Sequence, residues 1–224
     1  MSKQRIHWKT HLVELIVVIL GITIAFAIDE YAANRKEAAE IEVALRSIMD
    51  DLQSDVTNFE RYQVPYNEEK LTQMEYILKQ LAEENLGDDS LHNYIRSMFG
   101  SFNGIVTIAS YESLKSSGKL EDIPNVEMRR RIINHYENNH AQSRYLTNYH
   151  TEFSTKLSDY VSSISSAFFT YDFNDPKLLK DPGFRSMTAR WFQMITFKVS
   201  EYKRLLEQSE DLLNYMKEEL DGKK

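Results

Sequence analysis

The residues best suited to metal chemistry in this sequence are six histidines, because the chain has no cysteine. Without cysteine there is no disulfide, no thiolate zinc ligand and no cysteine nucleophile. His135 and His140 are five residues apart, which places them about 140° apart around a helix. They are therefore poorly placed to share one metal ion, and no HExxH motif is present. The sequence predicts no metal site.

Carboxylate pairs are the remaining candidates for acid–base chemistry. Glu83-Glu84 and Asp88-Asp89 fall at expected helix ends or turns, where they are typical of solvated positions, although their distances in space stay open. Phosphate-binding loops of the GxxxxGK[ST] or GxGxxG type are absent, and so is a GxSxG nucleophile elbow. We expect a protein that is not an enzyme, with no catalytic residue and no cofactor.

Composition narrows the fold class and the partners. The 224 residues include 7 Gly and 4 Pro, too few for the frequent turns of an all-β sandwich or barrel. Acidic residues outnumber basic ones by 34 to 27, for a net charge of −7. Because nucleic-acid binding requires clustered Lys and Arg, we expect no nucleic-acid partner.

An apolar run near the N-terminus is typical of a transmembrane helix. Residues 12–28 are LVELIVVILGITIAFAI, in which Glu14 is the one charged residue. At about 1.5 Å per residue the run spans roughly 26 Å, close to the hydrocarbon thickness of a bilayer. Trp8, Lys9 and Tyr31 flank it, where we expect them to anchor the helix at the membrane interface.

Two other interpretations of this run stay open. Its basic start and the sequence Ala25-Phe26-Ala27 resemble a signal peptide with a cleavage site. A buried helix of a soluble core has a similar length, although such a helix is seldom apolar on every side. The uninterrupted helical pattern beyond Ala27 favours a retained membrane anchor.

The distribution of basic residues predicts the orientation. Three of the first eleven residues are basic, whereas Arg35 and Lys36 are the only basic residues among the first fifteen after the run. This bias favours a cytoplasmic tail at 1–11, a transmembrane helix at 12–31 and a periplasmic remainder. The predicted location is a bacterial inner membrane, crossed once.

One face of the transmembrane helix carries Glu14 and small residues. Glu14, Val18, Gly21 and Ala25 share this face at 100° per residue, and Gly21 and Ala25 form a small-xxx-small pair that lets backbones approach closely. We expect this face to self-associate. The alternatives are that Glu14 extends to the lipid headgroups, or that it lines an ion or proton path.

The pattern of the rest of the chain predicts amphipathic helices. Apolar residues recur every three or four positions, which predicts long helices at about 32–62, 66–85, 126–169 and 182–221. Asn125 and Asp181-Pro182 are start signals for the last two. The expected architecture is all-α: a transmembrane helix continuous with a long amphipathic helix, and a domain at 32–224 packed as an up-and-down helical bundle.

Two segments resemble an uncharacterised family of small single-pass bacterial membrane proteins that is abundant in Bacteroidota. The first resembles its GE-x-x-LVV-x-GI-x-IA helix and the second, YESLKSSGKLEDIPNVEMRRRIINHYE, its YxxLxSSGxL stretch with a following R-x-x-I-x-x-Y. The matching positions are Glu14, Val17, Val18, Gly21, Ile22, Ile24, Ala25, Tyr111, Leu114, Ser117, Gly118, Leu120, Ile123, Asn125, Arg129, Ile132 and Tyr136. The resemblance implies an architecture and a membrane location, and no activity.

The second segment has two interpretations. Capping by Gly118 and Asn125, with packing by the leucines and isoleucine between them, explains its residues without a binding role. Alternatively, five basic residues form a docking segment for an acidic partner or a lipid headgroup. These are Lys115, Lys119, Arg129, Arg130 and Arg131.

Together these patterns predict a non-enzymatic, membrane-anchored interaction or assembly protein. Its expected partners are the lipid bilayer, further copies of itself and a second membrane or envelope protein. The alternatives are a ligand-sensing bundle that acts through a separate membrane partner, and an oligomeric ion- or proton-conducting protein that uses Glu14.

Overall fold

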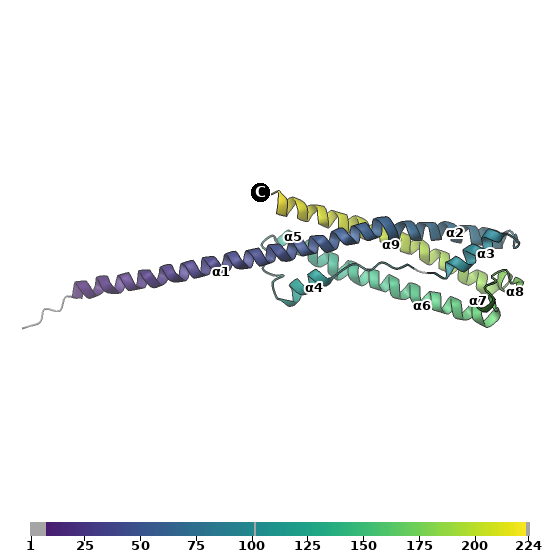
Figure 1. Cartoon of the computed structure of the whole chain (residues 1–224), viewed down its shortest axis with the longest axis horizontal. Helices are drawn as coiled ribbons and strands as arrows, with labels where there is room; N and C mark the ends of the chain where they lie inside the picture. The colour runs from purple at the N-terminus through teal and green to yellow at the C-terminus, as the bar shows by residue number, and fades with distance from the viewer. Residues whose placement is uncertain (1–7, 101, 223–224) are drawn as a thin grey trace, which may run out of the picture. The chain divides into compact units, whose positions relative to one another are not determined.

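The computed structural model describes residues 8–100 and 102–222, with side chains from Leu12 onward. These residues form helices and connecting segments without a β-strand (Figure 1). The predicted all-α class, with a long N-terminal helix and a helical bundle, is confirmed. The chain divides into two compact units, Met1–Arg46 and Ser47–Lys224.

The first unit is the N-terminal part of α1, a helix that extends from Trp8 to Asn58. All side chains described from Leu12 to Glu40 are exposed. No residue of its most apolar 18-residue window is buried. By length and composition the helix is able to cross a membrane, a property that it shares with a cleavable signal sequence.

The structure differs from the prediction of separate helices on either side of Pro65. α1 continues through a π-helical turn, η1 (Phe59–Gln63), into α2 (Val64–Ala82). At this turn the Val64 N–H donates to the carbonyl of Phe59, five residues earlier. Pro65 then occupies the first turn of α2, where its missing N–H costs little, so the helix continues.

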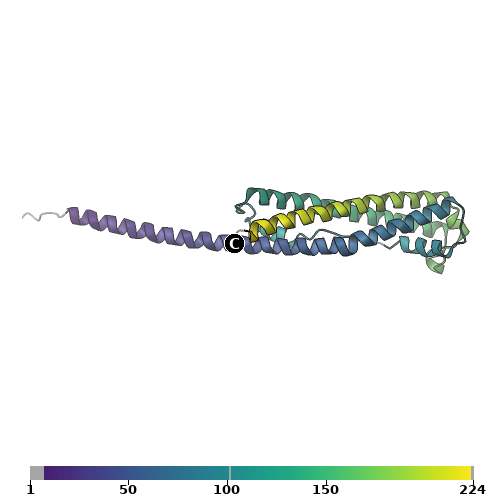
Figure 2. The same cartoon turned by 90° about the horizontal axis from the view of Figure 1, so that it is seen from above.

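The second unit is a bundle in which α9 packs against α2 and α6. α6 runs in the same direction as α2, and α9 in the opposite direction (Figures 1 and 2). The elements after α2 are α3 (Asp89–Met98), α4 (Ala109–Ser116), α5 (Val126–Asn134), the π-helical turn η2 (His135–His140), α6 (Ala141–Ile164), α7 (Ala167–Thr170), α8 (Pro176–Leu179) and α9 (Pro182–Asp221).

Side-chain caps set the starts of α3, α5, α8 and α9. Asn125 accepts a hydrogen bond from the Met128 N–H and Asp181 accepts one from the Phe184 N–H, as predicted for the starts of α5 and α9. The helix predicted at 126–169 ends earlier, at Ile164. Ser165 is extended there, and its hydroxyl donates to Asp175 and accepts from the Ala167 N–H, which stabilises a new turn.

A seven-residue segment without regular structure, the strap (Phe102–Ile108), leads from the end of α3 to α4. Asp55 holds its far end, because Asp55 accepts hydrogen bonds from the N–H and the hydroxyl of Thr107 at 2.9 and 2.7 Å. Its middle is held by Tyr202, whose hydroxyl accepts from the Gly104 N–H at 2.9 Å. Polar side chains of helices thus replace the missing backbone partners of the strap.

A side chain at Gly104 is expected to destabilise the bundle. A Cβ there would lie 2.9 Å from Gln63 Cγ and 3.0 Å from Phe59 Cε1, both in buried residues. We expect Gly104→Ala to lower the free energy of unfolding by about 1–3 kcal/mol, as overpacking does. The matched control is Gly87→Ala, whose added Cβ has no neighbour within 4 Å and should change stability by less than about 0.5 kcal/mol. Equal effects in urea titrations would contradict this packing.

Candidate functional site

The predicted self-association face lies on the exposed part of α1. Glu14, Val18, Gly21 and Ala25 are all exposed, and a Cβ built on Gly21 has no neighbour within 4 Å. The face is therefore open to another helix.

The predicted interface anchors are described only in part. Tyr31 is 64% exposed, and the Arg35 guanidinium lies 5.9 Å from the centre of its ring. The side chains of Trp8 and Lys9 and the tail at 1–7 lie outside the described part of the chain.

The predicted basic docking segment is largely neutralised by acids of the same chain. Arg130 and Arg131 both pair with Glu127 at 2.8 Å, and Arg129 pairs with Glu121 at 3.2 Å. These hydrogen bonds lower the pKa of Glu127 to about 2. The run of three arginines therefore offers little uncompensated positive charge to a partner.

The other two basic residues of that segment lie at or near α4. Lys115 pairs with Glu137 at 2.5 Å, while Lys119, in the turn after α4, is half-buried. Gly118 has a positive φ of 75° and ends α4 in the left-handed conformation, as its position predicts. Helix capping and internal ion pairs thus account for much of this segment.

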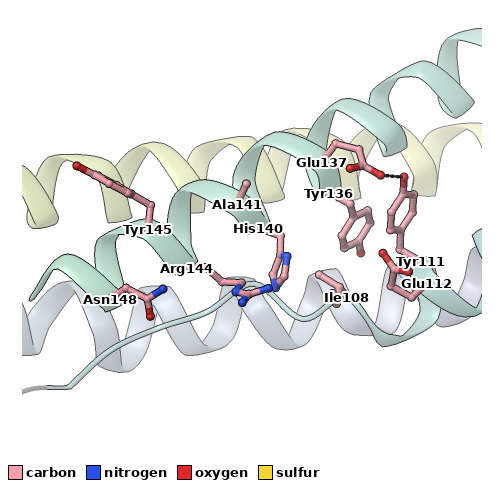
Figure 3. Close-up of a pocket in the computed structure, with 10 residues that line it drawn as sticks. All are labelled: Ile108, Tyr111, Glu112, Tyr136, Glu137, His140, Ala141, Arg144, Tyr145 and Asn148. Carbon is pink, nitrogen blue, oxygen red and sulfur yellow. Dashed lines mark hydrogen bonds between the residues drawn. The ribbon is translucent and has the colours of Figure 1, made fainter. Parts of the chain in front are cut away.

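A groove of about 440 Å³ opens beside this segment, and we call it the α4–α6 groove. α4, η2 and α6 supply its walls (Figure 3). Its lining residues are Ile108, Tyr111, Glu112, Tyr136, Glu137, His140, Ala141, Arg144, Tyr145 and Asn148. Several of them belong to the segment that the sequence singled out.

Two stacked tyrosines form one end of the α4–α6 groove. The rings of Tyr111 and Tyr136 are 4.7 Å apart and nearly parallel, and Tyr111 donates to Glu137 at 2.7 Å. Burial and this hydrogen bond raise the pKa of Tyr111, while Lys115 and Tyr111 lower the pKa of Glu137. The pair is therefore a neutral phenol on a charged carboxylate, a stable structural contact.

The open part of the α4–α6 groove presents charges of both signs. Glu112 is on one wall, and on the other His140 and Arg144 lie one helical turn apart (Figure 3). Burial, followed by the charge of Arg144, lowers the pKa of His140, so this ring is neutral at pH 7. Such a surface is electrostatically complementary to a polar partner that carries both positive and negative groups.

A second cavity, of about 220 Å³, lies between α6 and α9, and we call it the α6–α9 cavity. His150 from α6 and Lys198 from α9 line it, and both are buried. Neither residue is among those predicted from the sequence. The available signal was a lysine at position 198 within the apolar stripe of the last helix, between Ile195 and Val199.

Metal binding has no evident site in the described residues. Within residues 8–100 and 102–222 there is no group of three or more His, Asp or Glu side chains placed to hold a metal ion. Neither cavity brings a hydroxyl nucleophile together with a base and an orienting carboxylate in the manner of a catalytic triad.

Over the described residues, 8–100 and 102–222, the protein is all-α, with one candidate membrane-spanning helix and a helical bundle that contains the α4–α6 groove and the α6–α9 cavity. The chain belongs to a family of unknown function, DUF6090, whose model matches residues 14–193. That range includes the exposed small-residue face of α1 and the whole lining of the α4–α6 groove. Searches of curated proteins and of solved structures found no significant match.

Proposed function

We propose that this protein is a non-enzymatic, single-pass membrane protein that self-associates through α1 and presents its helical bundle to a partner. The observation that carries the proposal is the apolar run of α1, whose side chains from Leu12 to Ile28 are all exposed. An exposed apolar surface of this extent in water is costly, and a bilayer removes that cost. Family membership adds no activity, because the function of the family is unknown.

A retained anchor agrees better with this helix than a cleaved signal peptide. α1 continues from Trp8 to Asn58 without interruption at Ala27, the position after which cleavage would occur. Basic residues before the run favour a cytoplasmic N-terminus and a bundle on the other side of the membrane.

Self-association follows from the shape of one face of α1. Gly21 and Ala25 leave a shallow surface one turn apart, and Val18 extends it. Between lipid-embedded helices, close backbone approach at small residues provides the packing that drives association. A hydrogen bond from the Glu14 carboxyl to a second copy across this face would offset part of the cost of placing Glu14 in the membrane.

The test replaces both small residues with leucine. We expect Gly21→Leu combined with Ala25→Leu to convert an oligomer of the detergent-solubilised protein to monomer, measured by light scattering corrected for detergent. The control is Ala27→Leu, which makes the same change as Ala25→Leu about 150° around the helix and should keep the oligomer. An oligomer of unchanged mass in the double variant would contradict the proposed interface.

For the bundle, we propose the α4–α6 groove as the surface that a protein partner contacts. Its mixed charge at Glu112 and Arg144 favours a polar peptide segment over a lipid headgroup, which would require a net positive surface. The neutralised arginine run near it supports the same choice.

A further inference from the structure

Two lysines are buried in the bundle without a carboxylate hydrogen-bonded to them. Lys70 on α2 is 4% exposed and donates to the carbonyls of Ser97 and Gly100. Lys198 on α9 is 1% exposed and donates to the Phe102 carbonyl at 3.0 Å and to Asn103 Oδ1 at 2.7 Å. An ammonium has three N–H donors, so Lys198 has one to spare.

Next to Lys198 lies a buried histidine that makes no hydrogen bond. His150 is 3% exposed, and neither ring nitrogen has a partner among the protein atoms. Its ring lies 4.2 Å from that of Trp191. Leaving a buried polar group unpaired costs about 1–3 kcal/mol, a cost that a ligand hydrogen-bonded to His150 would offset.

Lys198 and His150 line the same α6–α9 cavity. Arg190 stands exposed at its rim and Gln193 also lines it, so four nitrogen-bearing side chains surround the cavity, and no Asp or Glu is among its lining residues. The rest of the wall is mainly apolar. Leu146, Met194 and Phe197 form it. The cavity thus combines hydrogen-bond donors with an apolar surface and lacks negative charge.

We propose that the α6–α9 cavity binds a small molecule that carries a carboxylate next to a short apolar chain. Lys198 and His150 donate to the carboxylate, and the apolar wall contacts the chain. The apolar wall selects this ligand over a fully polar anion such as phosphate. This inference is independent of the membrane anchor and of the α4–α6 groove.

The electrostatics of the cavity agree with an anionic ligand. Burial and the nearby Lys70 lower the pKa of Lys198 to about 7, and burial with both lysines lowers the pKa of His150 to about 3. A bound carboxylate stabilises the charged form of Lys198 and raises that pKa. The charged groups that face Lys198 are Lys70 from α2 and Arg190 from α9, so nothing anionic competes with the ligand there. Binding near pH 7 should therefore take up a proton, and it should weaken as the pH rises above 7.

Trp191 provides an optical readout in the full-length protein. The chain has two tryptophans, so Trp8→Phe leaves Trp191, beside His150, as the single tryptophan, whose fluorescence can be followed separately. We would titrate this variant in neutral detergent with hexanoate, with its uncharged analogue hexanamide and with inorganic phosphate. We expect a saturable fluorescence change with hexanoate at pH 6.5, at least tenfold weaker binding of hexanamide and phosphate, and at least tenfold weaker hexanoate binding at pH 9.

Two variants locate the binding. In the Trp8→Phe protein, His150→Phe should abolish the hexanoate response while raising or preserving the unfolding temperature without ligand, because it removes unpaired nitrogens. Lys198→Met should abolish the response as well. His140→Phe, in the α4–α6 groove, is the matched control and should leave it unchanged.

The titration of the Trp8→Phe protein is sufficient to overturn the proposal, whatever the stability of the other variants. No saturable response to hexanoate, or equal responses to hexanoate and hexanamide, would exclude a carboxylate site. Phosphate binding as tight as that of hexanoate would exclude the apolar selectivity. A hexanoate response that survives both His150→Phe and Lys198→Met would show binding elsewhere.

Discussion

Trp191→Ala is expected to lower the free energy of unfolding of the bundle by about 3–5 kcal/mol, the range for truncating a large buried aromatic. Trp191 is fully buried, stacks on Phe153 at 5.4 Å and donates from Nε1 to the Met98 carbonyl at 3.2 Å. Truncation leaves a cavity between α6 and α9 and an unpaired carbonyl at the end of α3. It also removes the wall that holds His150.

Urea unfolding followed by circular dichroism in detergent measures this effect. The matched control is Phe169→Ala, because Phe169 is 90% exposed and its loss should cost less than about 0.5 kcal/mol. Trp191→Phe should lie between the two, since it keeps the stacking and loses the hydrogen bond. Comparable losses in Trp191→Ala and Phe169→Ala would mean that Trp191 is not a core residue.

Asp55→Ala is expected to cost about 2–3 kcal/mol, because hydrogen bonds to charged groups are stronger than neutral ones and Thr107 would lose two hydrogen bonds. Asp55 is 2% exposed, and it joins the strap to the helix that precedes α2. Its loss should release the end of the strap and raise hydrogen exchange at the Thr107 amide. Unchanged protection at that amide would contradict the role of Asp55.

The contribution of Asp55 to the stability of the bundle depends on pH, and the direction of the pKa shift of Asp55 sets the sign of that dependence. Burial raises the pKa of Asp55 to about 6, from 3.8 in the unfolded chain. A raised pKa gives a stabilising contribution that is complete below pH 3.8 and is lost as the pH rises through 6. In Asp55→Asn this contribution is absent, so between pH 4 and pH 7 the stability of the native protein relative to the variant should fall by up to about 3 kcal/mol. A constant difference would contradict the buried ionisation.

Local sequence patterns were sufficient to predict most of the helices, and tertiary contacts explain the exceptions. Asn125 and Asp181 mark helix starts because a cap depends on residues two or three positions away. Pro65 does not end a helix, because the preceding π-helical turn moves it into the first turn of α2. Buried Phe59 and Gln63 in that turn pack within the bundle, and their burial depends on residues far along the chain.

The neutralised arginine run and the α6–α9 cavity differ in how far the sequence could predict them. The ion pairs of the arginine run could be predicted from the sequence, because Glu127 lies three and four residues before Arg130 and Arg131. The α6–α9 cavity could not be predicted from the sequence. Lys198 is held by strap residues 95 and 96 positions away, and no local pattern indicates such partners. The one local indication of this cavity was Lys198, a lysine within an apolar stripe.

The most direct test of the proposed membrane anchor uses a single cysteine in this cysteine-free chain. Ser90 is exposed at the start of α3, so Ser90→Cys can be labelled in intact bacterial cells with a membrane-impermeant maleimide, with lysed cells as the reference. We predict that intact cells give labelled protein of full mass in the membrane fraction. Labelling only after lysis, or labelled protein that is soluble and lacks the N-terminal run, would contradict an anchored bundle outside the cytoplasm.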